Sequence, residues 1–155
     1  FGEAFFKAQE ATQTKLPLDG TVLISVRDKD KEEVVKVAKD FVEAGFKLMA
    51  SKGTCACLQE AGLEVTRVKK LQEGRPDMLD LITNGDVDLV INTPIGKEAL
   101  EDDSYLRKAA IKAKVPYMTT IAAAKATISG IKSMKKPGCG SVKSLQELHA
   151  EITEV

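Results

Sequence analysis

The chain has 155 residues, of which 43% are hydrophobic, and this is enough for a single domain with a well-buried core. The 23 basic and 23 acidic residues cancel, so no overall field attracts nucleic acid or an anionic membrane. Three cysteines without metal-ligand spacing and a single histidine argue against a disulfide framework and a structural zinc site, and favour a cytoplasmic location. No apolar run reaches the roughly 18 residues of a membrane span.

The opening segment carries an apolar stripe at helical spacing, formed by Phe1, Ala4, Phe5 and Ala8. The stripe leads into a loop rather than into another regular element. We expect a helix that belongs to whatever precedes it in a longer polypeptide. A helix that covers the edge of this domain's own sheet is the alternative.

From Gly20 onward, short β-rich runs alternate with longer helical patterns, which is typical of βαβ units and a mainly parallel sheet. Strands are predicted over residues 21–26, 46–50, 63–68, 87–91 and 115–118. The fourth of these runs is continuously apolar, and we expect it to be the central strand. Helices are predicted from a capping-box start at Asp30 and Glu33 to Gly45, over 54–61 and 77–83, from Asp103 or Ser104 onward, over 120–131 and around 145–152.

The segment 46–54 is the most informative part of the chain. Its apolar strand runs directly into Ser51, Lys52, Gly53 and Thr54, and then into a helix. A helix N-terminus offers unpaired backbone N–H groups and the positive end of the helix dipole, and the hydroxyl groups add side-chain donors. This junction predicts a phosphate site.

Similar donors follow the other predicted strands. Because the carboxyl ends of parallel strands meet at one edge of a sheet, we expect these side chains to converge there. They are Ser25, Arg27, Lys31, Ser51, Thr54, Lys69, Lys70, Asn92 and Thr93. The set is rich in donors and poor in acids, which favours a phosphate group with an attached polar body such as a nucleotide. Each of these residues alone also fits a purely structural role.

Several segments resemble the methylglyoxal-synthase-like domain family, and most closely the allosteric domains at the C-terminus of carbamoyl phosphate synthetase large chains. The segments are residues 24–31, 45–54, 73–76, 89–93 and 106–110, in the same order and with similar spacing. The resemblance implies an α/β fold of three layers, in which a five-stranded parallel, Rossmann-like sheet lies between helices. It also implies that residues 1–15 are the tail of the preceding synthetase domain and that residues 16–155 are the allosteric domain.

In this family the regulatory domain controls an enzyme whose chemistry takes place elsewhere, so the resemblance implies no catalytic residue here. Carried over by position, the effector site corresponds to Ser25, Lys31, Ser51, Thr54, Lys70, Asn92 and Thr93. The phosphate is expected near Lys31, Ser51 and Thr54. The implied ligand is a nucleotide monophosphate of the UMP or IMP type, which adjusts carbamoyl phosphate synthesis for the pyrimidine and arginine pathways.

The resemblance also implies the surroundings of the domain. The parent enzyme would be an ATP-dependent carbon–nitrogen ligase that uses ATP, Mg and K ions, with no metal or cofactor in this domain. The expected partners are the synthetase domains of the same chain and the glutaminase small subunit. Neither nucleic acid nor a membrane is expected as a partner.

Two alternatives remain open at the level of sequence. The same superfamily contains enzymes that act on phosphorylated substrates, namely methylglyoxal synthase and the IMP cyclohydrolase domain. Residues 69–76 occupy the loop that carries a catalytic Gly-Gly-Asp in methylglyoxal synthase, but they contain no such motif, and the single histidine, His149, is remote in sequence. The other alternative is an assembly surface formed by the opening stripe and the closing helix.

Overall fold

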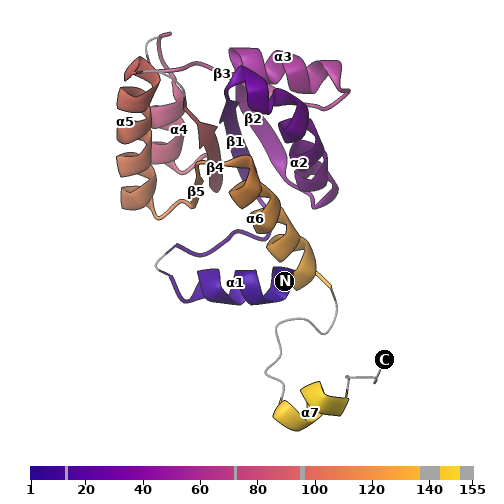
Figure 1. Ribbon diagram of the computed structural model, residues 1–155. Helices are drawn as coiled ribbons and strands as arrows, with labels where there is room; N and C mark the ends of the chain where they lie inside the picture. The colour runs from indigo at the N-terminus through magenta and orange to yellow at the C-terminus, as the bar shows by residue number, and fades with distance from the viewer. Residues whose placement is uncertain (13, 72, 95–96, 137–143, 151–155) are drawn as a thin grey trace.

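A single parallel sheet forms the centre of the computed structural model, which describes residues 1–12, 14–71, 73–94, 97–136 and 144–150 (Figure 1). The sheet has five strands in the order β3-β2-β1-β4-β5, and every pairing is parallel. The strands are β1 (Thr21–Val26), β2 (Lys47–Ser51), β3 (Thr66–Val68), β4 (Leu89–Thr93) and β5 (Tyr117–Met118). Helices cover both faces, so the predicted three-layer α/β fold is confirmed.

Side chains that alternate along the strands supply the two cores on either side of the sheet. From β1, Val22 and Ile24 enter the core beneath α2, α3 and α6, while Leu23 enters the core beneath α4 and α5. The helices are α2 (Lys31–Glu43), α3 (Lys52–Glu60), α4 (Met78–Asn84), α5 (Lys97–Ala113) and α6 (Ile121–Met134). β4 is buried along its whole length, but the central strand is β1, which differs from the expected arrangement.

One predicted helix start is confirmed without its capping box, and another is wrong. Asp30 is the N-cap of α2, but its side chain makes no cap hydrogen bond and instead accepts one from Arg27 Nε at 2.7 Å. The helix expected to begin at Asp103 or Ser104 begins at Lys97. Asp103 therefore lies within α5, where it is buried and only 4% exposed. Asp103 was predicted as a cap because a polar residue followed by an apolar stripe occurs both at the start of a helix and within one.

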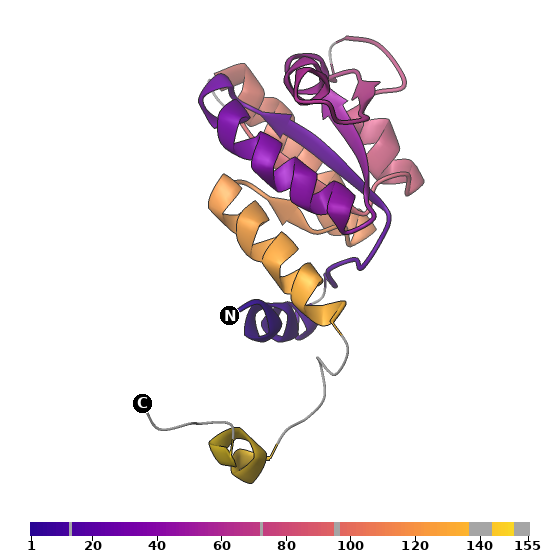
Figure 2. The same ribbon diagram turned by 90° about the vertical axis from the view of Figure 1, so that its right-hand side faces the viewer.

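The first helix, α1 (Gly2–Glu10), lies across the end of α6 (Figures 1 and 2). The two backbones approach closely at Gly130, since a Cβ there would lie only 3.2 Å from the carbonyl oxygen of Gly2. Phe6 is buried in this contact region and belongs to the core under α6. That this helix is the tail of a preceding domain stays a prediction.

The closing helix is present as α7 (Leu145–Ala150). Leu145 and His149 are exposed, whereas Ile152, which was expected on the same apolar face, lies outside the described residues. Within the described part of the chain, no helix has the combined length and apolarity that crossing a membrane requires.

The loop that follows β3 is tied to the start of α4 by a capping box. The Asp77 carboxylate accepts hydrogen bonds from the backbone N–H groups of Leu79 (2.8 Å) and Asp80 (3.0 Å), and Asp80 accepts one from the N–H of Asp77 at 3.1 Å. Asp77 also forms a bridge with Lys69, next to the last residues of β3. The cap therefore holds the loop over the carboxyl end of the sheet.

We expect Asp77→Ala to lower the free energy of unfolding by about 1–2 kcal/mol, because two N–H groups at the start of α4 lose their acceptor. Urea denaturation followed by circular dichroism measures this change. Asp86→Ala is the matched control, since Asp86 is exposed near the other end of α4 and no hydrogen bond of its side chain is described. Equal stability of the two variants would contradict the role given to the cap.

Candidate functional site

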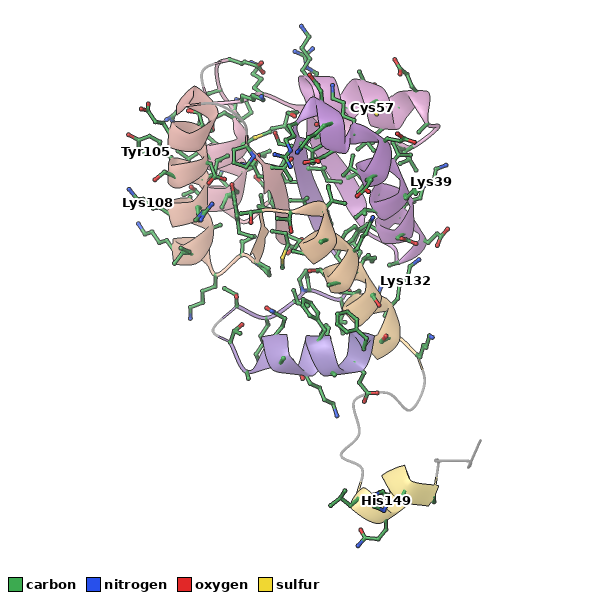
Figure 3. All side chains as sticks on the ribbon, viewed as in Figure 1. Lys39, Cys57, Tyr105, Lys108, Lys132 and His149 are labelled. Carbon is green, nitrogen blue, oxygen red and sulfur yellow. The ribbon has the colours of Figure 1, made fainter. Side chains whose placement is uncertain are left out.

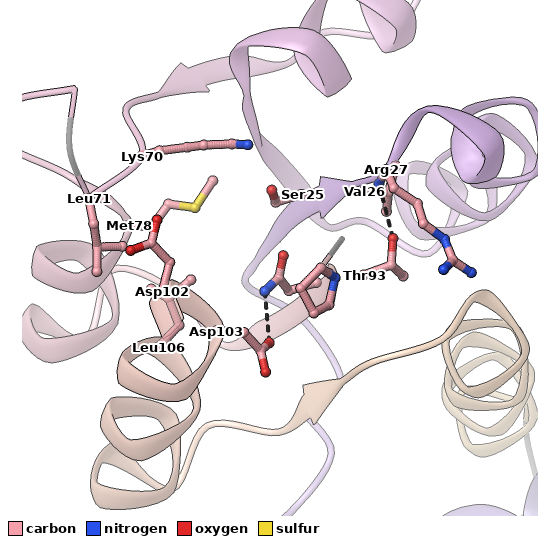
Figure 4. Close-up of a pocket in the computed structure, with 12 residues that line it drawn as sticks. Ser25, Val26, Arg27, Lys70, Leu71, Met78, Thr93, Asp102, Asp103 and Leu106 are labelled. Atoms are coloured by element: carbon pink, nitrogen blue, oxygen red, sulfur yellow. Dashed lines mark hydrogen bonds between the residues drawn. The ribbon is translucent and has the colours of Figure 1, made fainter. Parts of the chain in front are cut away.

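A pocket opens at the carboxyl ends of β1 and β4, where the order of the strands reverses (Figure 4). The chain passes from β1 outward to β2 and β3, and then crosses back to place β4 on the other side of β1. Such a reversal leaves a crevice at the carboxyl edge of the sheet. The empty space in the pocket, including open solvent at its mouth, is about 550 Å³.

The wall of this pocket is formed by both polar and apolar side chains. The polar lining residues are Ser25, Arg27, Lys70, Asn92, Thr93, Asp102 and Asp103. The apolar lining residues are Val26, Leu71, Met78, Pro94 and Leu106. Of the predicted site residues, the structure brings Ser25, Lys70, Asn92 and Thr93 into this wall. Their contact with a ligand stays a prediction.

The strand register explains why two of these residues are neighbours. In the pairing of β1 with β4, Ser25 lies opposite Asn92 and Val26 lies opposite Thr93. The backbone N–H of Arg27, just beyond β1, donates to Thr93 Oγ1 at 3.1 Å. The guanidinium of Arg27 pairs with Asp30 and is turned away from Ser25 in Figure 4. Arg27, which the sequence placed among the donors, is therefore engaged in an ion pair inside the domain.

Ser51 and Thr54, at the junction of β2 and α3, lie on the other side of β1. Their side chains are buried, with 3% and 1% of their surface exposed. Ser51 Oγ donates to Thr54 Oγ1 at 3.3 Å, and Thr54 Oγ1 accepts the backbone N–H of Val26 at 3.1 Å. Thr54 thus ties the first turn of α3 to the last residue of β1. A phosphate contact by these hydroxyl groups stays a prediction beside this structural role.

Lys31 lies over the first turn of α3. A Cβ placed on Gly53 would be 3.3 Å from Lys31 Nζ, so the glycine leaves room for this ammonium group. No side-chain hydrogen bond caps α3, because Ser51 points to Thr54 instead. A cation and an uncapped helix N-terminus therefore share one spot, which is the arrangement that favours an anion.

A solvent-facing carboxylate holds Lys31 in place. Asp28 Oδ1 lies 2.7 Å from Lys31 Nζ, and the Asp28 side chain is 95% exposed. The hydrogen bond with Asp28 raises the pKa of Lys31. The same contact lowers the pKa of Asp28, and the charge of Lys70 lowers it further. Lys31 and Lys70, which come from different parts of the chain, thus both act on Asp28 at the rim of the site.

The prediction that the site is poor in acids is wrong. Asp102 and Asp103 both line the pocket, because α5 begins at Lys97 and carries these two residues past the end of β4. Asp103 is hydrogen-bonded to Asn92 (3.0 Å), Tyr117 (2.6 Å) and Arg107 (2.7 Å). Sequence reasoning also missed the apolar wall from Leu71, Met78 and Leu106. The sequence signal for the carboxylates was the pair Asp102-Asp103, which comes soon after a buried strand.

Comparison with known proteins identifies the family to which this chain belongs. The family model described as "MGS-like domain" matches residues 33–119, so the chain belongs to the MGS-like domain family. Two solved structures share its fold: methylglyoxal synthase from Elizabethkingia anophelis NUHP1 and ForH. The former has a TM-score of 0.56 and 19% identity over 90% of this chain and 95% of that one. The latter has a TM-score of 0.53 and 18% identity over 75% and 78%.

Within this family the chain is similar over nearly its whole length to the carbamoyl phosphate synthase large chain. It is 47% identical over 150 residues to the C-terminal section of that large chain from Methanopyrus kandleri, and 45% identical over 153 residues to the section from Aquifex aeolicus. It is 44% identical over 151 residues to the large chain from Methanothrix thermoacetophila. The alignments cover 96%, 96% and 97% of this chain but only 28%, 28% and 14% of the relatives.

We expect Thr54→Val to lower the free energy of unfolding by about 1–3 kcal/mol, because the N–H of Val26 loses its buried acceptor. Thr54→Ser is the matched control, since it retains the hydroxyl group, and it should keep most of the stability. Urea denaturation of the two variants and of the unchanged chain makes the comparison. If the serine variant is as unstable as the valine variant, the hydroxyl is not the group that matters.

Proposed function

We propose that this chain is the effector-binding regulatory domain of a carbamoyl phosphate synthetase large chain, with a nucleotide monophosphate of the UMP or IMP type as its ligand. The observation that carries the proposal is the mixed chemistry of one pocket. Lys70 and Ser25 line it together with the acceptor groups of Asn92 and Asp102 and with an apolar wall. A ligand with a phosphate and a hydrogen-bond-donating body fits this combination.

The groups that would hold a phosphate are cationic or N–H groups on both sides of β1. In Figure 4 the Lys70 ammonium extends above Ser25. Lys31 does not line this pocket but lies across β1 from it, over Gly53 and the uncapped start of α3. Two ammonium groups and a helix N-terminus suit a dianionic phosphate, and the exposed Asp28 is the group that a phosphate would replace beside Lys31.

For the nucleoside, the pocket combines acceptors with an apolar wall. A ribose or a base offers O–H and N–H donors, for which the carboxylate of Asp102 and the carbonyl of Asn92 are suitable acceptors. The side chains of Leu71, Met78 and Leu106 supply a surface for the face of a base.

A regulatory role also agrees with the contacts beneath the pocket. The carboxylate of Asp103 already accepts three hydrogen bonds within the domain. Burial, and then the hydrogen bond to Asp103, raises the pKa of Tyr117 further from neutrality, which does not suit proton transfer by this phenol. The proposed site is therefore suited to binding, with binding energy coupled to the activity of the parent enzyme through different affinities for its states.

The larger assembly is part of the same proposal. The relatives are large chains several times longer than this one, which supports further synthetase domains in the same polypeptide. Residues 1–15 would be the tail of the preceding synthetase domain, and a glutaminase small subunit would complete the enzyme. The parent would use ATP with Mg and K ions to make carbamoyl phosphate for the pyrimidine and arginine pathways, in the cytoplasm.

Isothermal titration calorimetry of the chain with UMP and with IMP tests the proposal. We expect one site per chain for at least one of the two nucleotides, with inorganic phosphate as a weak competitor. Absence of binding by both nucleotides at millimolar concentration would overturn the proposal. Formation of methylglyoxal from dihydroxyacetone phosphate by the chain would also overturn it, because the pocket would then be catalytic.

We expect Lys70→Ala to weaken nucleotide binding roughly tenfold, because a charge-assisted contact with the phosphate is lost. Added salt should weaken binding to the unchanged chain more than binding to the variant. Lys39→Ala is the control, since Lys39 projects from the outer side of α2, away from the pocket (Figure 3). Equal affinities of the Lys70 and Lys39 variants would remove Lys70 from the site.

A further inference from the structure

Three side chains from different elements meet on the buried carboxylate of Asp103. Oδ1 accepts hydrogen bonds from Asn92 Nδ2 at 3.0 Å and from the Tyr117 hydroxyl at 2.6 Å. Oδ2 accepts one from the guanidinium of Arg107 at 2.7 Å, which also supplies the balancing charge. The cluster joins the end of β4, the strand β5 and the middle of α5 directly beneath the pocket.

A count of protons fixes the orientation of the Asn92 amide. Asn92 Nδ2 carries two hydrogens, and it donates one to Asp103 and the other to the Tyr117 oxygen at 2.8 Å. Tyr117 has one hydroxyl hydrogen, which goes to Asp103. Burial, and then the hydrogen bond to Asp103, raises the pKa of Tyr117, so the phenol keeps this hydrogen. Turning the amide around would set its oxygen against a carboxylate that only accepts.

Both hydrogens of the Asn92 amide are therefore used within the domain, and its carbonyl oxygen is the atom that can bind a ligand. No hydrogen bond to this oxygen is present among the described residues, and within the same part of the chain no fully buried side-chain oxygen lacks a partner. The oxygen is therefore accessible, and Asn92 lines the pocket. Asn92 was predicted as one of a set of donors, but its geometry makes it an acceptor.

We propose that Asp103 is a positioning residue that locks the Asn92 amide with its oxygen available to the pocket, so that the site selects ligands offering an O–H or N–H donor at that point. This inference rests on the proposed function, because it concerns the same pocket. A sugar hydroxyl and a ring N–H are the two sources of such a donor in a nucleotide. An analogue that lacks the donor leaves the oxygen desolvated without a partner, which lowers its affinity.

The first experiment tests the lock without any ligand. The chain has two asparagines, and Asn84 is exposed, so Asn84 provides an internal reference for hydrogen exchange of side-chain amides measured by NMR. Both Nδ2 hydrogens of Asn92 should exchange at least tenfold more slowly than those of Asn84. Asp103→Asn should remove most of this protection, because an amide at position 103 can also donate to the Asn92 oxygen. Equal exchange at Asn92 and Asn84 in the unchanged chain would overturn the inference.

The second experiment tests selectivity. UMP and IMP are compared with their 2′-deoxy, 3′-deoxy and ring-N-methyl analogues by calorimetry, and the analogue that binds roughly fivefold to tenfold more weakly identifies the donor. In Asp103→Asn this ratio should fall toward one, while the affinity for inorganic phosphate stays unchanged. Glu101→Gln is the matched control, because Glu101 is an exposed carboxylate on the same helix, and it should preserve the ratio.

The outcomes separate the two proposals. Failure of the unchanged chain to bind either nucleotide overturns the proposed function, and with it the selectivity, while the exchange measurement still decides whether Asp103 fixes the amide. Normal nucleotide binding with no preference among the analogues, or with a preference that Asp103→Asn retains, overturns the inference alone. If Asp103→Asn does not fold, Tyr117→Phe takes its place, since it removes one of the two acceptors of the Asn92 amide.

Discussion

The pairing of β1 with a parallel strand on each side is the constraint on which the rest of the structure depends. β1 is matched to β2 from Thr21 to Ile24 and to β4 from Val22 to Val26. This register sets Ser25 beside Asn92 at the carboxyl edge, and a slip of one residue would turn one of them to the opposite face of the sheet. The reversal of strand order at the same place opens the pocket.

The end of β1 is held by side chains from both of its neighbours. The N–H of Val26 donates to Thr54 at the start of α3, and the N–H of Arg27 donates to Thr93 at the end of β4. These backbone groups lie where the sheet pairing stops, so without the two hydroxyl groups they would lack partners in a buried region. The polar residues that line the site therefore also stiffen its rim, which helps to keep a binding surface preformed.

The pocket joins two kinds of polar chemistry that come from different parts of the chain. Lys70 comes from the loop after β3, while the carboxylates of Asp102 and Asp103 come with α5. One of these carboxylates, Asp103, acts on its neighbours within the domain, whereas Asp102 faces the pocket without a hydrogen bond in the described residues.

The sequence by itself determined the fold class and several of the residues that line the pocket. Hydrophobic periodicity and glycine stops predicted five parallel strands, and hydroxyl and lysine residues after the strands pointed to the edge of the sheet at which the pocket opens. Only the tertiary structure decided that Thr54 and Thr93 hold β1, that Arg27 pairs with Asp30, and that α5 brings carboxylates to the pocket. The reason is physical: periodicity records which face of an element is buried, whereas the direction of a hydrogen bond depends on partners that are distant in sequence.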